Sequence, residues 1–193
     1  GSCEVANAVN DMSDMFAVAT IDEGVHLRIA GGIKKPILVL GPTFTGEDDQ
    51  VIEYGLTQPI FDFDRARSLN ESVNEFVAEN LEKLKDMQYI APDYKAHVHI
   101  AVDTGMSRIG LKPDMEGAET IKKIAELGNI VIDGIFTHFA KADARDKKDA
   151  LEAYSKFRDF KKLCTEHGIS IPVWHCANTA SIIDGIGLDD DMD

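Results

Sequence analysis

The regular alternation of short apolar runs with longer amphipathic stretches is the feature that most constrains the fold. The apolar runs predict six strands, at residues 15–20, 36–41, 59–63, 96–102, 130–136 and 171–175. The stretches between them predict helices at residues 22–30, 46–55, 71–87, 115–127 and 148–167. Strands that alternate with helices run parallel, because each helix carries the chain back to the starting edge of the sheet. We therefore expect a parallel sheet covered by helices.

Six alternations fit both a doubly wound sheet and a (β/α)8 barrel, and periodicity alone does not separate the two. The polar residues favour the barrel, because residues suited to chemistry follow several strands: Asp103 to Arg108, His138, and Asn178 with Thr179. The glycine-rich phosphate loop of doubly wound folds does not occur in the sequence. We predict one α/β domain over residues 1–193, an incomplete (β/α)8 TIM-type barrel with about six strands, its first and last strands missing.

Composition excludes several classes of function. The formal net charge of -14 repels nucleic-acid phosphates, so we expect no nucleic-acid partner. No apolar window reaches the roughly 20 residues of a membrane span, and the opening residues do not look like a signal peptide. We therefore expect no membrane association and a cytoplasmic protein. The cysteines, Cys3, Cys164 and Cys176, are too few and too scattered for a disulfide framework or a zinc site, and Cys176 is expected to be buried.

The clearest candidate site follows the predicted strand at 96–102. The loop that begins at Asp103 places a guanidinium, Arg108, at the strand mouth, where it can bind a carboxylate, phosphate or phenolate through paired donors. A structural pair between Asp103 and Arg108 explains the same residues equally well. His97 and His99 alternate along the strand, but no further ligands stand at a recognisable spacing. We expect these histidines to pack or to form hydrogen bonds, and we expect no metal site.

Two further strand ends carry candidate residues. His138 follows the fifth predicted strand and can stack on a planar ligand or move protons, although a lone histidine is more often structural. Asn178 and Thr179 follow the sixth strand and open a helix, where backbone N–H groups, the hydroxyl and the helix dipole can bind a phosphate. An ordinary helix cap is the plainer interpretation of either residue alone. Trp174 is expected in the core.

Together these segments resemble alanine racemase and the fold type III pyridoxal 5'-phosphate (PLP) enzymes. The matching segments occur in family order and spacing: 16–20, 23–24, 27–28, 36–41, 103–110, 134–140, 142–143 and 175–180. The resemblance implies a (β/α)8 barrel that holds PLP at its C-terminal mouth. It also implies a C-terminal β domain, absent from this chain, and a homodimer in the complete protein.

The resemblance assigns roles to individual residues. The implied cofactor contacts are Leu40, Arg108, His138, His175, Asn178 and Thr179. Arg108 matches the arginine that approaches the phenolic oxygen of PLP and the substrate carboxylate, and Met106 is also expected on the substrate side. His138 matches the histidine packed against the pyridine ring. Thr179 stands where the family usually has a phosphate-binding serine, and the hydroxyl is kept.

The chain departs from the family pattern in three places. Many members carry a lysine, often carbamylated, two residues before Asp103, where it orients the arginine. Here that residue is Ala101, so we expect no carbamylated lysine and support for Arg108 from another side chain or a bound anion. The family lysine that holds PLP would precede Gly1, and the tyrosine base would follow Asp193. We therefore expect no catalytic base in this chain and little or no racemase activity from it alone.

The expected function of the complete protein is PLP-dependent interconversion of L- and D-alanine, an isomerase reaction that supplies D-alanine for peptidoglycan. This chain is expected to contribute part of the binding wall. Three alternatives stay open: a serine racemase of the same family, a non-catalytic PLP-binding barrel, and a partial product that binds no ligand.

Overall fold

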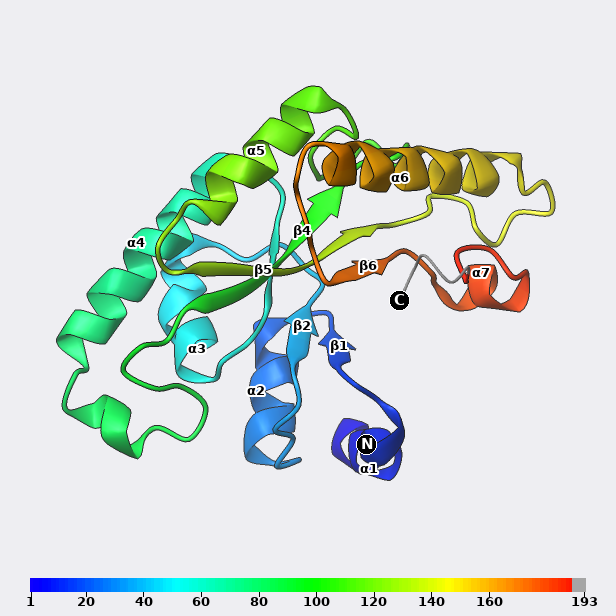
Figure 1. Ribbon diagram of the computed structural model, residues 1–193. Coiled ribbons are helices and arrows are strands. Elements are labelled where there is room, and N and C mark those ends of the chain that lie inside the picture. The colour runs from blue at the N-terminus through cyan, green and yellow to red at the C-terminus, as the bar shows by residue number, and fades with distance from the viewer. Residues whose placement is uncertain (189–193) are drawn as a thin grey trace. The chain divides into compact units, whose positions relative to one another are not determined.

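The computed structural model describes residues 1–188, and the chain divides into two compact units. Unit 1 comprises Gly1–Pro59, Asp64–Val98 and Leu127–Val131. Unit 2 comprises Ile60–Phe63, His99–Glu126 and the chain from Ile132 onward. Strands and helices alternate along the chain as the sequence predicts (Figure 1).

All six predicted strands form, although most are shorter than the apolar runs that predict them. They are β1 (Phe16–Val18), β2 (Ile37–Val39), β3 (Gln58–Ile60), β4 (Ala96–Val102), β5 (Ile130–Thr137) and β6 (Val173–His175). The α-helices among the described residues are α1 (Ser2–Val9), α2 (Ile21–Ile29), α3 (Asp48–Glu53), α4 (Phe63–Glu79), α5 (Met115–Ala125), α6 (Lys148–Glu166) and α7 (Thr179–Ile183). Three short 3-10 helices complete the list: η1 (Asn10–Met12), η2 (Thr45–Glu47) and η3 (Lys83–Asp86).

The helix predicted at 71–87 is placed wrongly. Helix α4 begins at Phe63 and ends at Glu79, eight residues before the predicted start and end. The apolar run at 59–63 predicts a strand over its whole length, whereas β3 ends at Ile60. The buried apolar positions of α4 already recur at helical spacing from its second turn: Ala66, Leu69, Val73 and Phe76.

The strands are hydrogen-bonded in the order in which they occur in the chain. β1 pairs with β2 in parallel, and a further parallel bridge joins Leu38 to Thr57, the residue before β3. The four-stranded sheet has the order β3-β4-β5-β6, and β5 pairs with β6 in parallel. A doubly wound sheet would reverse its strand order at a switch point, whereas a barrel keeps chain order. The prediction of a partial (β/α)8 barrel is confirmed.

Each unit has its own apolar core. In unit 1 it is built from α1, α2, β2, α3 and the segments that follow α2 and α3: Ala6, Ile21, Leu27, Ile33, Ile37, Val39, Val51 and Leu56. In unit 2, Trp174 is 3% exposed and its ring lies 5.4 Å from that of Phe157 and 6.3 Å from that of Phe160. The core position expected for Trp174 is confirmed, as is the burial of Cys176.

Unit 1 also contains a buried arginine whose side chain donates hydrogen bonds to backbone carbonyl groups. Arg28, 4% exposed, donates to the carbonyl oxygens of Tyr54, Gly55, Ile33 and Lys35 at 2.7–3.0 Å. Buried carbonyl groups that have no partner within a strand or helix need such donors, because an unpaired buried acceptor costs about 1–3 kcal/mol. Arg28 therefore joins the end of α2 to the loops around β2 and α3.

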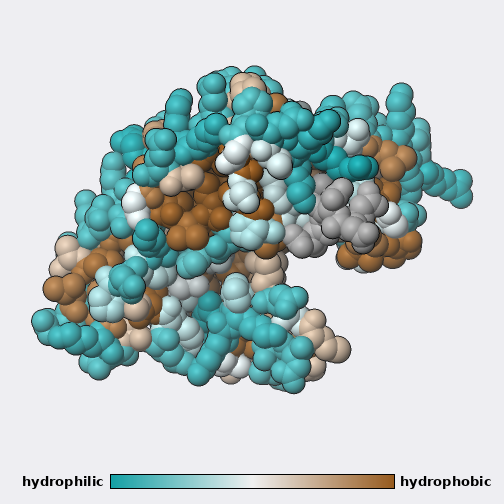
Figure 2. All heavy atoms as spheres, in the orientation of Figure 1, coloured by the Kyte–Doolittle hydropathy of each residue, from teal (hydrophilic) through white to brown (hydrophobic). Residues whose placement is uncertain are grey.

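Hydrophilic side chains cover most of the face seen in Figure 2, in keeping with the net charge of -14. Within residues 1–188, no helix combines the length and the apolar character that a membrane crossing requires.

Candidate functional site

The loop after β4, which carries Arg108, is closed at its base by backbone hydrogen bonds. The N–H of Asp103 donates to the carbonyl of Leu111, and the N–H of Leu111 donates to the carbonyl of Ala101, both at 2.9 Å. Ala101, the position at which the family resemblance leads us to expect a lysine in many members, is 3% exposed within the strand. The two ends of the loop are thus hydrogen-bonded to each other, and the exposed Arg108 lies between these ends.

The Asp103 side chain forms hydrogen bonds to the backbone of its own loop. Its carboxylate Oδ1 accepts from the N–H of Gly105 at 3.0 Å and from the N–H of Ser107 at 2.9 Å. Ser107 has a φ of 56°, a left-handed conformation that costs a non-glycine residue energy and needs outside support. Gly110 has a φ of 121°, and a Cβ there would lie 2.9 Å from the Asp103 nitrogen. The Asp103 carboxylate therefore shapes the backbone that presents Arg108. The sequence suggested a structural role for Asp103 as a pair with Arg108, but not these bonds to backbone N–H groups.

Two threonines tie the same loop to the end of β5. The Thr137 hydroxyl donates to the Val102 carbonyl at 2.8 Å, and the Thr104 and Thr137 hydroxyl oxygens are 2.8 Å apart. Because Thr137 has only one hydroxyl proton, Thr104 is the donor in the second bond. Both threonines are buried. His138 follows Thr137 directly, so these bonds couple the positions of the Arg108 loop and of His138.

His138 and Met106 line one cavity of about 280 Å³. The rest of its lining comes from the two strand ends and from α6: Thr104, Gly105, Ala140, Lys141, Asp149, Glu152, Ala153 and Lys156. Lys141 pairs with Asp149 at 2.8 Å, which raises the pKa of the lysine and lowers the pKa of the carboxyl group. Lys156 pairs with Glu152 at 2.9 Å. These lysines therefore have acidic partners on the cavity wall.

The end of β6 leads into α7 through a well-formed cap. The Asn178 side chain accepts from the Ser181 N–H at 3.1 Å, and the Ser181 hydroxyl oxygen accepts from the Asn178 N–H at 2.8 Å. This is a reciprocal capping arrangement, so the plainer interpretation of Asn178 as a helix cap is confirmed. Thr179 is the first residue of α7, and its side chain is exposed.

His175 ends β6 and is half-buried against β4. Its Nε2 lies 2.8 Å from Nδ1 of His99, so the hydrogen-bonding role expected for His99 is confirmed. His97, at the start of the same strand, is exposed.

The predicted site residues fall into two groups. Those in unit 2 all follow the C-terminal ends of β4, β5 or β6: Met106, Arg108, His138, Asn178 and Thr179, with His175 as the last residue of β6. Neighbouring parallel strands end at the same edge of a sheet, which is where barrel enzymes place their binding residues. Leu40 follows β2 in unit 1 and is 46% exposed.

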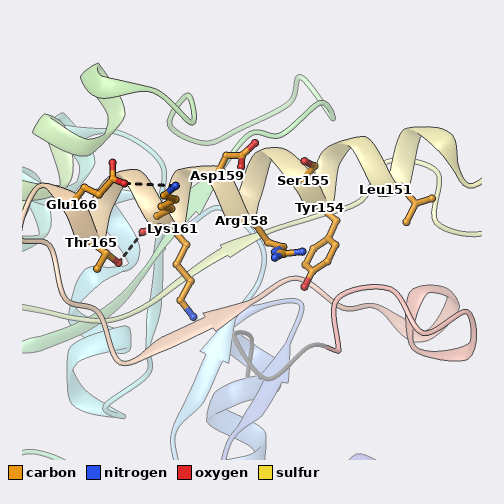
Figure 3. A pocket seen from close by; sticks show the side chains of 9 residues that line it. Leu151, Tyr154, Ser155, Arg158, Asp159, Lys161, Thr165 and Glu166 are labelled. Carbon is orange, nitrogen blue, oxygen red and sulfur yellow. Dashed lines mark hydrogen bonds and ion pairs between the residues drawn. The ribbon is translucent and has the colours of Figure 1, made fainter.

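A larger cavity of about 670 Å³ lies along α6, away from every predicted site residue. Figure 3 shows its wall, made by side chains from successive turns of that helix: Leu151, Tyr154, Ser155, Arg158, Asp159, Lys161, Lys162, Thr165 and Glu166. Arg158 lies over the Tyr154 ring, and Lys161 lies over the Trp174 ring at 5.8 Å. The exposed face of one amphipathic helix explains this surface without a ligand.

Comparison with known proteins identifies the family. The family profile described as "Alanine racemase, N-terminal domain" matches residues 1–192. The curated alanine racemase of Methanococcus maripaludis is 40% identical over 185 residues, which is 95% of this chain and 45% of that protein. The alanine racemase of Clostridium tetani is 38% identical over 169 residues, which is 88% of this chain and 39% of that protein.

Solved structures agree with the sequence comparisons. Alanine racemase from Clostridium difficile 630 superposes with a TM-score of 0.82 at 31% identity, over 97% of this chain and 46% of that chain. Its complex with cycloserine gives a TM-score of 0.80 at 32% identity, over 94% of this chain and 46% of that chain. The chain thus spans somewhat less than half of the relatives that it matches. The chain belongs to the alanine racemase N-terminal domain family.

Proposed function

We propose that this chain supplies the cofactor- and substrate-binding wall of a PLP-dependent alanine racemase whose full length is that of the relatives. The observation that carries the proposal is that Arg108, His138 and Thr179 lie in the segments that follow β4, β5 and β6, three neighbouring strands of one sheet, and that all three residues belong to unit 2. Every relative named above is an alanine racemase, which favours alanine over serine as the substrate and catalysis over PLP binding alone.

The chemistry of the side chains fits PLP. The cofactor carries a phosphate, a flat pyridine ring and a phenolic oxygen, and each needs a different kind of partner. Thr179 offers an exposed hydroxyl for the phosphate, and His138 an exposed imidazole beside a cavity for the ring. Arg108 offers a guanidinium for the phenolic oxygen. Thr179, His138 and Arg108 therefore have the side-chain chemistry that PLP requires.

In this proposal the residues of this chain bind and orient the cofactor and the substrate, while the cofactor supplies the electron withdrawal. Bound PLP withdraws electrons from the substrate α-carbon and makes its proton acidic. The planar guanidinium of Arg108 receives the substrate carboxylate through paired N–H donors, and Met106 covers the neighbouring surface. Asp103 keeps the backbone around Arg108 in one conformation. Fixed geometry of this kind raises the rate because the reacting groups need not be ordered during the reaction.

The partners in the proposal follow from the family. We infer a homodimer as the working form and a cytoplasmic location, with the product D-alanine serving as a peptidoglycan precursor. The exposed apolar residues of unit 2 near the C-terminal end support further packing partners: Leu151, Ile182, Ile183 and Leu188.

The test is racemase activity of the full-length protein with L-alanine and L-serine. We expect kcat/KM to be higher for alanine, and Arg108→Ala to reduce it by at least about 100-fold, because a charge-assisted paired contact contributes roughly 3 kcal/mol. Arg108→Lys should recover part of the loss. Arg67→Ala is the matched control, because Arg67 lies on the exposed face of α4 in unit 1. Unchanged kinetics in Arg108→Ala would refute the role of this arginine.

A further inference from the structure

Two imidazole rings from non-adjacent strands meet over β5. His99 lies on β4 and His175 ends β6, and in the sheet order these strands flank β5. The rings are 5.0 Å apart at their centres, tilted by 62°, and joined by the 2.8 Å contact between Nδ1 of His99 and Nε2 of His175. Strands two places apart are separated by about 9.6 Å, so both side chains must reach across the strand between them.

A glycine in β5 makes this contact possible. Gly134 pairs with Val173 in the register of β5 and β6, two residues before the pair of Phe136 and His175. A Cβ at position 134 would lie 2.6 Å from Cε1 and 2.7 Å from Nδ1 of the His99 ring. A Cβ does not approach non-bonded atoms this closely, so any other residue at 134 would displace the ring. The glycine therefore leaves the space that His99 occupies.

The surroundings keep both rings in place. His99 is 2% exposed, and burial lowers its pKa to about 4, an effect that the nearby Asp133 carboxylate partly opposes. At neutral pH the ring is therefore uncharged, with one N–H and one acceptor nitrogen. His175 is stacked on Phe136, with ring centres 5.3 Å apart and an angle of 16°. One ring is held by burial and the other by stacking, and a single hydrogen bond connects them.

One proton occupies the bond between the rings, so the tautomers of two neutral imidazoles depend on each other. If His99 Nδ1 donates, then His175 Nε2 accepts and the proton of His175 is on Nδ1. If His99 carries its proton on Nε2, then His175 donates from Nε2 and its Nδ1 becomes an acceptor. The state of His99 thus decides whether His175 presents a donor or an acceptor at its other nitrogen.

We propose that His99 is a positioning residue that fixes the ring orientation and the proton placement of His175. This inference rests on the proposed function, in which His175 belongs to the support of the cofactor. His175 is the last residue of β6, and the chain passes from it through two residues to the Asn178 cap and Thr179. A rotated His175 would disturb the strand end from which the phosphate-binding hydroxyl is presented.

The experiment is ¹⁵N NMR of the histidine rings in the full-length protein, without and with PLP. In the wild type we expect one tautomer for His175 and a measurable coupling across the bond to His99. His99→Leu removes the bonding nitrogen and should change the tautomer distribution of His175 relative to the wild type. His99→Asn keeps a polar group near the position of Nδ1 and should restore one tautomer.

Two glycine variants test the geometry without changing either histidine. Gly134→Ala should push the His99 ring away and reproduce the His99→Leu spectrum. Gly128→Ala is the matched control, because a Cβ at that position meets nothing within 4 Å. In the loaded enzyme we expect kcat/KM about tenfold lower for His99→Leu and within about threefold of wild type for His99→Asn.

The outcomes separate this inference from the proposed function. The same His175 tautomer distribution in wild type, His99→Leu and Gly134→Ala would overturn the positioning role, whatever the activity. If His99→Leu does not fold, absence of coupling between the two rings in the wild type overturns it equally. A coupled pair in a protein that neither binds PLP nor racemises alanine would leave the pairing correct and refute the proposed function.

Discussion

Replacing Asp103 by alanine should loosen the loop that carries Arg108. The substitution removes the acceptor of two hydrogen bonds, from the N–H groups of Gly105 and Ser107 at 3.0 and 2.9 Å. Each bond contributes about 1 kcal/mol, since the loop is largely exposed to water. The left-handed backbone of Ser107 also loses its support, so the ordered loop conformation should become less favourable by about 2 kcal/mol.

That free energy predicts a change in kinetics. If only the ordered loop presents Arg108 correctly, about 2 kcal/mol corresponds to a fall of roughly 30-fold in kcat/KM for L-alanine. The assay is steady-state racemisation by the full-length protein, with the free energy of unfolding measured alongside. Asp103→Asn is the informative control, because it keeps the accepting oxygen and loses only the charge, and it should stay within about fivefold of wild type. Asp103→Ala within twofold of wild type would refute the reasoning.

Three further predictions follow from buried or exposed groups. Arg28→Met should lower the free energy of unfolding by about 3–5 kcal/mol in urea titrations, because four backbone carbonyls lose their donor; a loss under 1 kcal/mol would contradict this. The pKa of His99 is about 4 in the folded protein and about 6.5 in the unfolded chain, so the unfolded chain takes up a proton first as the pH falls. The contribution of neutral His99 to the free energy of unfolding is therefore complete above pH 6.5 and is lost as the pH falls through 4. Relative to His99→Asn, the wild type should lose up to about 3 kcal/mol over that window, and parallel pH profiles would exclude the effect. Thr179→Ser should keep the affinity for PLP and Thr179→Val should weaken it about tenfold in absorbance titrations; equal affinities would remove Thr179 from the phosphate site.

The strand and helix pattern could be predicted from the sequence because apolar periodicity reports which face of an element is buried. The alternation of runs located β1 to β6, and Trp174 and Cys176 are buried as their residue types suggest. The boundary of α4 was missed because Phe63 suits a buried strand as well as a first helical turn. Only the tertiary packing of Ala66 and Leu69 decides between the two.

The candidate site was predictable as a set of strand-end residues and unpredictable in its connections. The order of motifs placed Arg108, His138 and Thr179 after successive strands. The bonds of Asp103 to its own loop depend on a left-handed Ser107, which periodicity does not encode. The pairing of His99 with His175 joins residues that are 76 positions apart. A glycine inside β5 was its only local signal, since glycine in a strand often marks a close approach.

The most direct test of the central claim is a crystal structure of the full-length protein with PLP and a non-reactive alanine analogue. The account predicts that the Thr179 hydroxyl donates to the phosphate, that the His138 ring packs against the pyridine ring, and that the Arg108 guanidinium faces the phenolic oxygen and the analogue carboxylate. A structure in which PLP binds elsewhere, or in which these three side chains point away from it, would contradict the account.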